Sequence, residues 1–537
     1  MVLSLEDYVL TGGDLGRYQI FLAIVSSSTI CMHTFCLTLE VFTALTPTCQ
    51  FYTENWWCPK KCSLQNICYA KKCNFSWDQP HQSIISEFNL FCHDAYKAKI
   101  VSSYAFLGYT IGCIFWGWMG DKIGRVPTIH LCQFLNTVLL YLTSLSPSYE
   151  YYCLARIFTG FTACHWNTAC VYATEWGGKR NRSFTLLAHI VYSSVAFALF
   201  GTIAFYVRPW RQLIVALSIF GGVVFLLMLP ALKESPRWLF CHGKKEKAVE
   251  NIQFAAKVNG LPVLYIADVD EDIILSESSA AESESVKLLF QRPRLIFITA
   301  TFYLTSAANV LIYYMLKFSA EKLSSSPYVS CWLLALSDLP SAAVVYFCSD
   351  VKRRPVNFWV QLIAVAFCFL CCVPQVRLAS AVLCMAFAAV SFNYVYLYLA
   401  EVYPTTMRNR VTAGCIAVAE IGGMVSNPLV LTTDIWDILP FLIAASVAVG
   451  PTIASWWLPE TKNRPLPDHF IDTLNIVYTQ EERPLVVVTD EEAASPKDKT
   501  SAPSFFRAGL SADLADSVSS RRDIPSLVDS ESIELAE

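Results

Sequence analysis

Charged side chains are scarce in this sequence. Lysine, arginine, aspartate and glutamate together make up 16% of its 537 residues, whereas hydrophobic residues make up 54%. The formal net charge is −4, and no basic tract is interleaved with aromatic residues, so binding to nucleic acid is not expected. No Walker loop, GxxxxGKS or GxxxxGKT, is present, which argues against nucleotide hydrolysis. No nucleophile–base pair or metal-binding cluster stands out, so neither an enzyme nor a bound cofactor is expected.

The hydrophobic residues come in long blocks, more than one soluble core could bury. An α-helix rises about 1.5 Å per residue and the apolar core of a bilayer is about 30 Å thick, so about 20 apolar residues span it. The blocks therefore predict an all-α membrane protein with twelve membrane-spanning helices. They cover residues 18–39, 100–119, 126–145, 151–173, 184–207, 212–232, 294–316, 327–348, 356–376, 379–399, 411–431 and 435–458.

The distribution of lysine and arginine predicts which loops lie inside the cell. Cytoplasmic loops carry an excess of both residues, and an inside N-terminus places the basic loops on that side. Both termini are then cytoplasmic. The predicted order is a cytoplasmic N-terminus at 1–17, a six-helix bundle at 18–232, a cytoplasmic linker at 233–293 with short helices such as 246–257, a second six-helix bundle at 294–458, and a largely disordered tail at 459–537.

Six cysteines lie in the segment 46–97, which this topology places outside the cell. An oxidising compartment permits disulfides, and a segment of this length without much core needs them. Six cysteines allow 15 pairings, among which the sequence does not choose, and a zinc site is the alternative. Asn74 begins an Asn-Phe-Ser glycosylation acceptor in the same segment. The predicted disulfide cysteines are Cys49, Cys58, Cys62, Cys68, Cys73 and Cys92.

Acidic and basic residues recur in the two predicted bundles at the inner ends of even-numbered helices. Corresponding clusters are separated by about 226 to 229 residues, which indicates two related halves. Such pairs can hold helix ends together and must break when the inner side opens, as in transporters that rock two repeats about a central site. The alternative is that they only mark the membrane interface. The predicted gating residues are Asp121, Arg125, Glu175, Arg182, Glu234 and Arg237 in the first half, and Asp350, Arg354, Glu401, Arg408 and Glu460 in the second.

Three motifs at these positions resemble those of the major facilitator superfamily and, within it, solute carrier family 22, the organic cation/anion transporters. They are the loop from Gly117 to Arg125, Glu234-Ser-Pro-Arg237, and Pro459-Glu-Thr-Lys462. The cysteine-rich outer segment is also typical of this family. The resemblance covers about residues 5–470 and implies the major facilitator fold. The chain departs from the family pattern at 350–354, which lacks the usual glycine, and at Asn463, where glycine is common.

Glu420 is the candidate for a substrate-binding charge. Ionisable residues inside a membrane are costly and rare, and they mark functional sites. Glu40 and Asp434 lie near the outer ends of predicted helices and could reach water, whereas Glu420 lies well inside 411–431, with Asn427 on the same helix face. The resemblance implies an aspartate here in the cation-transporting branch, and therefore a counter-charge for a cation. The alternative is a buried acid that is protonated or paired with another polar residue.

Aromatic rings suit a cationic substrate, because a ring face attracts a cation by about 0.5–2 kcal/mol. Trp166, Tyr313 and Tyr314 fall where the resemblance implies aromatic residues in cation transporters, and Asn393 is a further predicted substrate contact. The alternative for each ring is packing or contact with lipid. Asp338, in an Asp-Leu-Pro sequence, resembles the family's Glu-x-Pro and is interpreted as structural.

Together these patterns predict a plasma-membrane carrier that moves small organic cations by alternating access. Its partners would be the cation and the lipid bilayer, and the sequence leaves the oligomeric state open. The membrane potential would drive uptake, since one positive charge falling through 100 mV releases about 2.3 kcal/mol. Two alternatives stay open: a transporter of organic anions or carnitine-like zwitterions, and a transporter-like receptor that binds without transporting.

Overall fold

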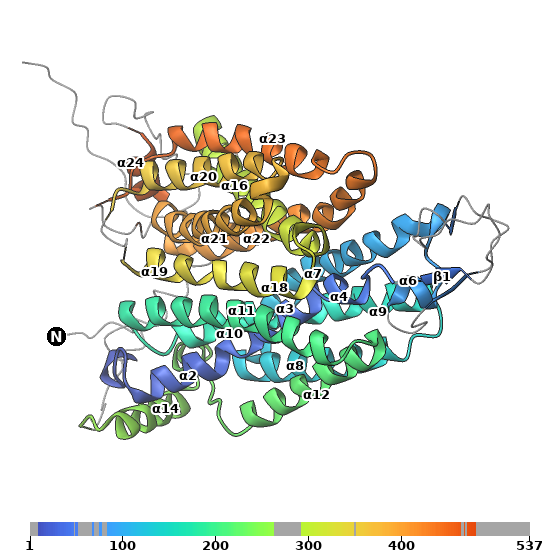
Figure 1. The fold of residues 1–537 in the computed structure, drawn as a ribbon. Coiled ribbons are helices and arrows are strands. Elements are labelled where there is room, and N and C mark those ends of the chain that lie inside the picture. Colours follow the sequence, from blue (N-terminus) through green and yellow to red (C-terminus); the bar gives the residue numbers. More distant parts are fainter. Residues whose placement is uncertain are drawn as a thin grey trace, which may run out of the picture. The chain divides into compact units, whose positions relative to one another are not determined.

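The computed structural model describes residues 9–47, 49–51, 67–68, 75–77, 83–262, 292–347, 351–462, 467 and 470–478. All of them belong to the unit Met1–Arg483. Its described part is mostly helical, as predicted. The sheet within it pairs β1 (Cys49–Phe51) with β2 (Phe75–Trp77) in antiparallel register, with Gln50 opposite Ser76. This sheet lies at one end of the helices, at the right of Figure 1.

The helices between residues 17 and 259 form a first group. Within it, α7 packs on α9, α8 packs on α12, and α11 packs on α2 and α3. The bounds are α2 (Arg17–Ser27), α3 (Thr29–Leu37), α4 (Glu40–Thr43), α6 (Ile84–Glu87), η1 (Cys92–Asp94), α7 (Ala95–Ile123), α8 (Arg125–Ser144), α9 (Tyr149–Thr162), α10 (His165–Thr174), α11 (Lys179–Tyr206), α12 (Trp210–Met228), α13 (Pro236–Cys241) and α14 (Lys245–Asn259).

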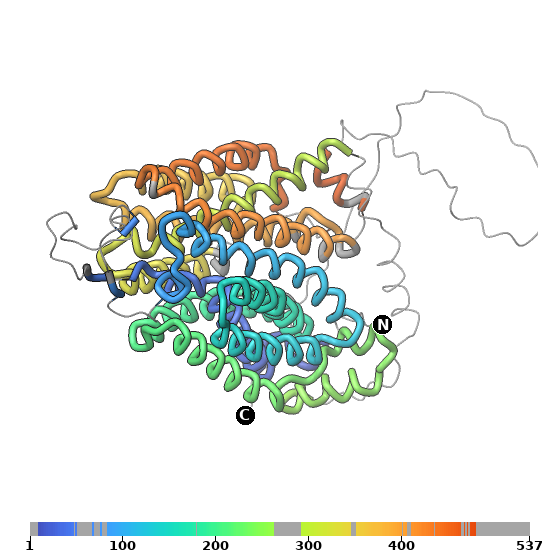
Figure 2. Tube along the Cα trace, turned by 90° about the vertical axis from the view of Figure 1, so that its right-hand side faces the viewer, coloured from blue at the N-terminus to red at the C-terminus, as the bar shows by residue number. Residues whose placement is uncertain are grey.

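The helices from residue 293 onward form a second group. Here α16 packs on α21, α22 and α23, and α20 packs on α21 and α23. Figures 1 and 2 show this group, coloured from yellow-green to red, lying beside the first. The bounds are α16 (Pro293–Phe318), α17 (Ala320–Leu323), α18 (Pro327–Ser337), α19 (Leu339–Phe347), α20 (Arg353–Leu370), η4 (Pro374–Val376), α21 (Arg377–Val402), α22 (Thr405–Val430), η5 (Leu431–Asp434), α23 (Leu439–Ala454), η6 (Ser455–Trp457) and α24 (Phe470–Val477).

Two sets of contacts join the groups. Helix α7 of the first group packs on α22 of the second, and α11 packs on α18 and α19. We call the end of the helices that carries β1 and β2 the sheet end. The opposite end, where α2 begins, is the cluster end, because the acidic and basic clusters lie there (Figure 1).

Within the residues that the structure describes, nine segments are long and apolar enough to cross a membrane. Besides 18–39, which α2 and α3 share, the predicted spans 151–173 and 327–348 are each divided into two shorter helices. The second division falls at Asp338, just before Pro340, whose ring disfavours helical backbone in the residues ahead of it. The nine segments are Arg17–Thr43, Cys92–Ile123, Arg125–Ser144, Arg180–Tyr206, Trp210–Met228, Pro293–Phe318, Pro374–Leu399, Arg410–Thr433 and Leu439–Trp457.

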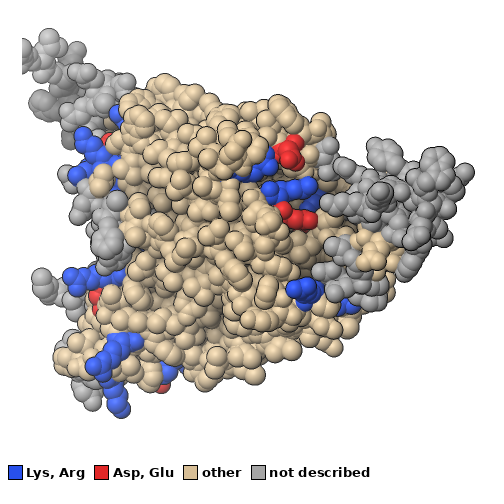
Figure 3. Space-filling model, in the orientation of Figure 1, with Lys and Arg blue, Asp and Glu red and all other residues tan. Residues whose placement is uncertain are grey.

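The surface between the two ends is apolar. On the face shown in Figure 3, charged side chains gather toward the ends and leave an uncharged band between them. Large apolar side chains such as Ile114, Leu226 and Leu227 are more than 60% exposed. Soluble proteins rarely expose so much contiguous apolar surface. The acyl chains of a bilayer would cover it, in agreement with a multi-pass membrane protein.

Helices α7 and α9 approach each other through glycine. A Cβ atom on Gly108 would lie 1.9 Å from the carbonyl oxygen of Ile157, and one on Gly160 would lie 2.0 Å from that of Ala105. Non-bonded atoms do not approach this closely, so a larger residue would force the two helices apart. Small residues are what allow membrane helices to pack at this distance.

We expect Gly108→Ala to lower the free energy of unfolding by about 3 kcal/mol, because overpacking here displaces backbone. Gly117→Ala is the matched control, since it lies in the same helix and its added Cβ would meet no atom within 4 Å. Both variants gain the same intrinsic helix propensity. Thermal melting of the purified protein in detergent measures the difference, and equal melting temperatures for the two variants would contradict this packing.

Glu40 does not reach water, contrary to the expectation from the sequence. Its carboxylate is fully buried and pairs with the equally buried guanidinium of Arg156 from α9. The two Nε–Oε1 and Nη2–Oε2 distances are 2.7 and 3.0 Å, and Nη2 also donates to the carbonyl oxygen of Cys36 at 2.5 Å. Arg156 lies inside the predicted span 151–173, and the sequence analysis did not single it out.

The helix predicted at 246–257 forms as α14. It ends at Gly260, whose φ of +74° lies in the left-handed region that favours glycine. Asn259, the last residue of the helix, holds it to the start of α2: its Oδ1 accepts from the backbone N–H of Tyr18 at 2.9 Å, and its Nδ2 donates to the carbonyl oxygen of Gly12 at 2.6 Å. These contacts attach the short helix to the first group.

One disulfide, Cys68–Cys92, joins the predicted outer segment to the start of α7. Cys49 of β1 is also disulfide-bonded. Cys58, Cys62, Cys73 and the predicted glycosylation residue Asn74 lie outside the described residues. The remaining pairing and the glycosylation therefore stay predictions.

Candidate substrate-binding site

Glu420 lies in the interior on α22, the helix that packs on both α16 and α7. Its side chain is 6% exposed, and the Oε2 atom has no hydrogen-bond partner among the described residues. The neighbouring Gly422 lets α22 approach α16, because a Cβ there would lie 2.2 Å from the carbonyl oxygen of Ala307. Glu420, whose carboxylate lacks a complete set of partners, therefore belongs to a helix that packs on one helix of its own group and on one of the other.

Three tyrosines lie within electrostatic range of this carboxylate. Glu420 acts electrostatically on the hydroxyl groups of Tyr109 from α7, Tyr314 from α16 and Tyr396 from α21. The first belongs to one helix group and the other two to the second group. Glu420 therefore interacts electrostatically with tyrosines from both groups. The sequence analysis predicted Tyr314 but missed Tyr109 and Tyr396.

Trp166 joins the same region through Tyr109. Its indole N–H donates to the Tyr109 hydroxyl oxygen at 2.9 Å, and the side-chain amide of Asn167 donates to that oxygen at 3.2 Å. The ring of His33, from α3, lies 5.1 Å from the ring of Tyr109 and 5.3 Å from that of Trp166. This gives the first helix group a wall of three rings on its side of the site.

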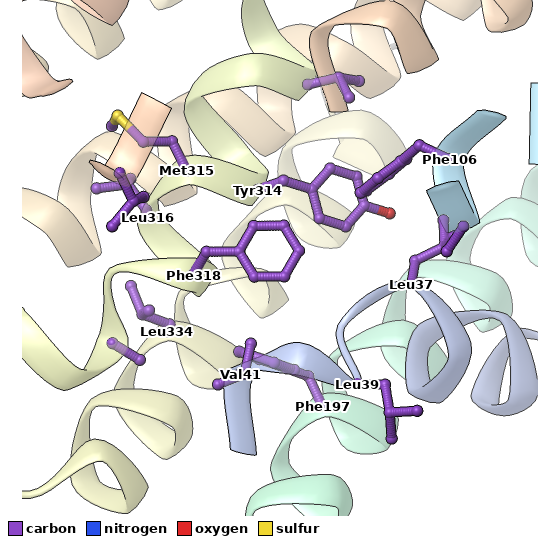
Figure 4. Packing of buried hydrophobic residues seen from close by; sticks show 14 of the residues in the cluster. Leu37, Leu39, Val41, Phe106, Phe197, Tyr314, Met315, Leu316, Phe318 and Leu334 are labelled. Atoms are coloured by element: carbon purple, nitrogen blue, oxygen red, sulfur yellow. The ribbon is translucent and has the colours of Figure 1, made fainter. Parts of the chain in front are cut away.

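Tyr314 forms the opposite wall and also closes the site toward the sheet end. Its ring lies 4.8 Å from that of Phe106 of α7 in an edge-to-face arrangement and 6.2 Å from that of Phe318. Figure 4 shows these three rings together, with Leu37 beside Phe106. Because Phe106 belongs to the first group and Tyr314 to the second, this contact would have to break for the sheet end to open.

Further contacts between the groups lie toward the sheet end. The Ser103 hydroxyl of α7 donates to the carbonyl oxygen of Met424 at 2.6 Å. The rings of Phe42 and Tyr328 stack with centroids 5.3 Å apart and planes 11° apart. Both pairs join one helix group to the other. These contacts hold the two helix groups together near the sheet end.

Of the other predicted substrate residues, one resembles Glu420 in its surroundings and two have hydrogen-bond partners elsewhere. Asn427 is buried on α22, and its Oδ1 has no hydrogen-bond partner within the described part of the chain, as for Glu420. Asn393 donates to the carbonyl oxygen of Ala389 at 2.9 Å, one turn back in its own helix. Tyr313 turns away from Glu420 and donates to Asp338 Oδ2 at 2.7 Å.

The first acidic and basic cluster is centred on Arg125, the first residue of α8. Its guanidinium lies 2.6 Å from Asp121 and 3.1 Å from Glu175. Its backbone N–H donates to Glu234 Oε1 at 3.0 Å. Burial raises the pKa of Glu234, and three backbone N–H donors oppose that rise. The cluster holds the end of α7, the end of α10 and the segment after α12 to the start of α8.

The second cluster repeats this arrangement around Arg353, the first residue of α20. Its guanidinium lies 2.7 Å from Glu401, and its backbone N–H donates to Glu460 Oε1 at 2.8 Å. The neighbouring Arg354 directs its guanidinium to the ring of Trp456, 5.3 Å away. The sequence analysis named Arg354 and missed Arg353. The position at the start of a helix, shared with Arg125, is the signal that identifies it.

The remaining predicted gating residues lie at the same end. Arg182 is in the first turn of α11 and Arg237 is in the first turn of α13. Arg408 is in the first turn of α22, but its side chain is outside the described residues, as is the whole of Asp350.

Comparisons with known proteins identify the family of the chain. A family model described as "Sugar (and other) transporter" matches residues 67–469. "Organic cation/carnitine transporter 4" of Arabidopsis thaliana is 28% identical over 85% of this chain and 88% of its own. "Solute carrier family 22 member 15-like" of Xenopus laevis is 30% identical over 74% of this chain and 82% of its own. "Organic cation/carnitine transporter 2" of Homo sapiens is 27% identical over 75% and 73%.

Solved structures with the same fold include the proton:xylose symporter XylE of the major facilitator superfamily. Its complex with 6-bromo-6-deoxy-D-glucose has a TM-score of 0.59 at 15% identity, covering 84% of this chain and 98% of that one. An inward-open form of XylE from E. coli has a TM-score of 0.58 at 13% identity, covering 83% and 97%. The chain described here has the major facilitator fold.

Proposed function

Because the chain belongs to the sugar (and other) transporter family, and within it to solute carrier family 22, we propose that it carries small organic cations across the plasma membrane. Relatives named as organic cation or carnitine transporters support a transporter rather than an enzyme. The observation that carries the choice of a cation is the buried carboxylate of Glu420, with tyrosines of both helix groups within its electrostatic range. An unpaired charge in the interior is costly, and a cationic substrate would offset that cost.

The proposed mechanism is alternating access between two six-helix bundles, 18–232 and 294–458, with twelve spans and both termini cytoplasmic. The site around Glu420 has walls from both helix groups, so a rocking motion would expose it to one side at a time. Contacts such as Phe106–Tyr314 close the sheet end, which we place outside the cell. The two arginine-centred clusters would hold the helix ends on the cytoplasmic side.

Uptake into proteoliposomes tests this function. We expect saturable uptake of tetraethylammonium that rises as the interior is made negative with a potassium gradient and valinomycin. A drop of 100 mV releases about 2.3 kcal/mol per charge, enough for roughly 50-fold accumulation. A sulfonated dye of similar size serves as the anionic comparison. Uptake of the anion alone would overturn the assignment of the cargo, and binding without any uptake would overturn the assignment as a carrier.

The clusters give a second test, at a distance from the substrate. We expect Arg353→Gln to lower the maximal rate of uptake about tenfold while leaving the affinity for the cation unchanged, because its pair with Glu401 holds helix ends and does not touch the site. Arg354→Gln is the matched control, since the backbone N–H that it offers to Glu460 remains. Initial rates at several cation concentrations separate the two parameters, and equal losses in both variants would contradict the role of Arg353.

A further inference from the structure

A second charged group is buried near the sheet end of α16. The side chain of Lys317 is 1% exposed, and the sequence analysis did not single it out. Its ammonium donates to the hydroxyl oxygen of Tyr313 at 2.7 Å, and that hydroxyl in turn donates to Asp338 Oδ2 at 2.7 Å. Asp338 is itself buried at the junction of α18 and α19, and its Oδ1 has no hydrogen-bond partner in the described part of the structure.

Aromatic faces complete the surroundings of this ammonium. Lys317 Nζ lies 4.1 Å from the ring centroid of Tyr313 and 4.2 Å from that of Phe197. Two rings within about 6 Å, a hydroxyl acceptor and a nearby carboxylate are the components with which proteins bind ammonium ligands. Lys317 also acts electrostatically on His33, whose ring lies 5.1 Å from that of Tyr109.

The ring of Phe197 comes from the other helix group. Its helix, α11, is held to α18 by a hydrogen bond from Ser194 to the carbonyl oxygen of Ala335 at 2.5 Å and by one from the Cys331 thiol to the carbonyl oxygen of Phe197 at 3.3 Å. The four components around Lys317 therefore meet only where α11 and α18 are in contact. If the two helix groups moved apart between α11 and α18, the Lys317 ammonium would lose its contact with the ring of Phe197.

We propose that Asp338, Tyr313 and Phe197 form a second ammonium-binding site, whose resident ligand is the side chain of Lys317 itself. The lysine neutralises Asp338 and joins the helix groups through Phe197. It also keeps the site closed to free primary ammonium ions. Removing the lysine side chain while keeping its backbone converts the site into one for a soluble alkylammonium. This inference does not depend on the cargo or the direction of transport.

Chemical rescue tests the proposal. Lys317→Ala leaves a space that matches n-propylammonium, since the alanine retains Cβ and three carbons and the nitrogen are lost. We expect n-propylammonium to raise the melting temperature of purified Lys317→Ala by about 2 °C or more, because a ligand that binds only the folded state stabilises it. The wild type should not respond, and neither should Lys322→Ala, an exposed lysine on α17. n-Propanol, which has the same length without the charge, should have no effect.

Asp338→Asn supplies the decisive comparison. Added to Lys317→Ala, it should abolish the rescue, because the negative charge that the Tyr313 hydroxyl links to the ammonium is gone. A rise in melting temperature that persists in the double variant would overturn the proposal. So would a rise in Lys317→Ala no larger than that in the wild type and in Lys322→Ala. Where Lys317→Ala does not fold, Lys317→Met keeps the length of the side chain, and Asp338→Asn should then destabilise it less than it destabilises the wild type. Equal destabilisation in the two backgrounds would also overturn the proposal.

Discussion

Replacing Glu420 with glutamine is expected to lower the uptake of organic cations at least tenfold. The substitution keeps the size of the side chain and removes its charge, so the attraction for a cation is lost while the packing of α22 stays. A tenfold change corresponds to about 1.4 kcal/mol, a modest fraction of the interaction between two unit charges in a partly buried site. Initial rates of tetraethylammonium uptake, normalised to the amount of folded protein, measure the effect.

The control for this substitution is Glu150→Gln, at an exposed position in the first turn of α9. It removes the same charge far from the site and should leave uptake unchanged. Glu420→Asp should retain part of the activity, because the charge remains and only its reach is shortened. Glu420→Arg should favour anions. Unchanged cation uptake in Glu420→Gln, together with no gain for anions in Glu420→Arg, would remove the basis for a cationic cargo.

The largest loss of stability is expected from Arg156→Met. The change leaves the carboxylate of Glu40 fully buried without its partner, and breaking one side of a buried pair costs about 3–5 kcal/mol. The hydrogen bond from the guanidinium to the carbonyl oxygen of Cys36 is lost as well. The fraction of protein that elutes as a single folded species, and its melting temperature in detergent, report the loss.

Two further variants show whether the loss of stability in Arg156→Met comes from the unpaired Glu40 carboxylate or from the loss of any positive charge. Lys97→Met removes a partly exposed ammonium that lies 2.9 Å from Asp94, and such surface pairs contribute less than about 1 kcal/mol. Adding Glu40→Gln to Arg156→Met should restore part of the stability, because no unpaired buried charge then remains. A loss in Arg156→Met no greater than that in Lys97→Met would show that the buried pair does not hold α4 to α9.

The sequence predicted the helices better than it predicted their interruptions. The blocks of apolar residues identify where the chain is helical, because length and hydrophobicity are local properties. The division of 327–348 at Asp338 was visible in principle from Pro340. The division between α9 and α10 was not, since Ala163 and Cys164 carry no turn signal of their own. Local propensity does not report the tertiary packing that decides such a break.

Site residues could be predicted from the sequence where their type is rare in apolar blocks. They could not be predicted where their type is common. Glu420 stands out because an acid in the middle of an apolar block is unusual. Tyr109 and Tyr396 do not stand out, since aromatic residues make up 14% of the chain and periodicity does not say which face meets the other helix group. Glu40 was expected to reach water because its partner, Arg156, lies 116 residues further along the chain. The pairing depends on how α4 and α9 pack, which only the three-dimensional structure provides.

The position of a bound cation tests the central claim most directly. A structure of the purified protein determined with tetraethylammonium would locate its nitrogen. The account predicts that this nitrogen lies beside the carboxylate of Glu420, within about 6 Å of an aromatic ring centroid among Tyr109, Tyr314 and Tyr396. A cation bound elsewhere with Glu420 unoccupied, for instance against Asp338 in place of Lys317, would contradict it.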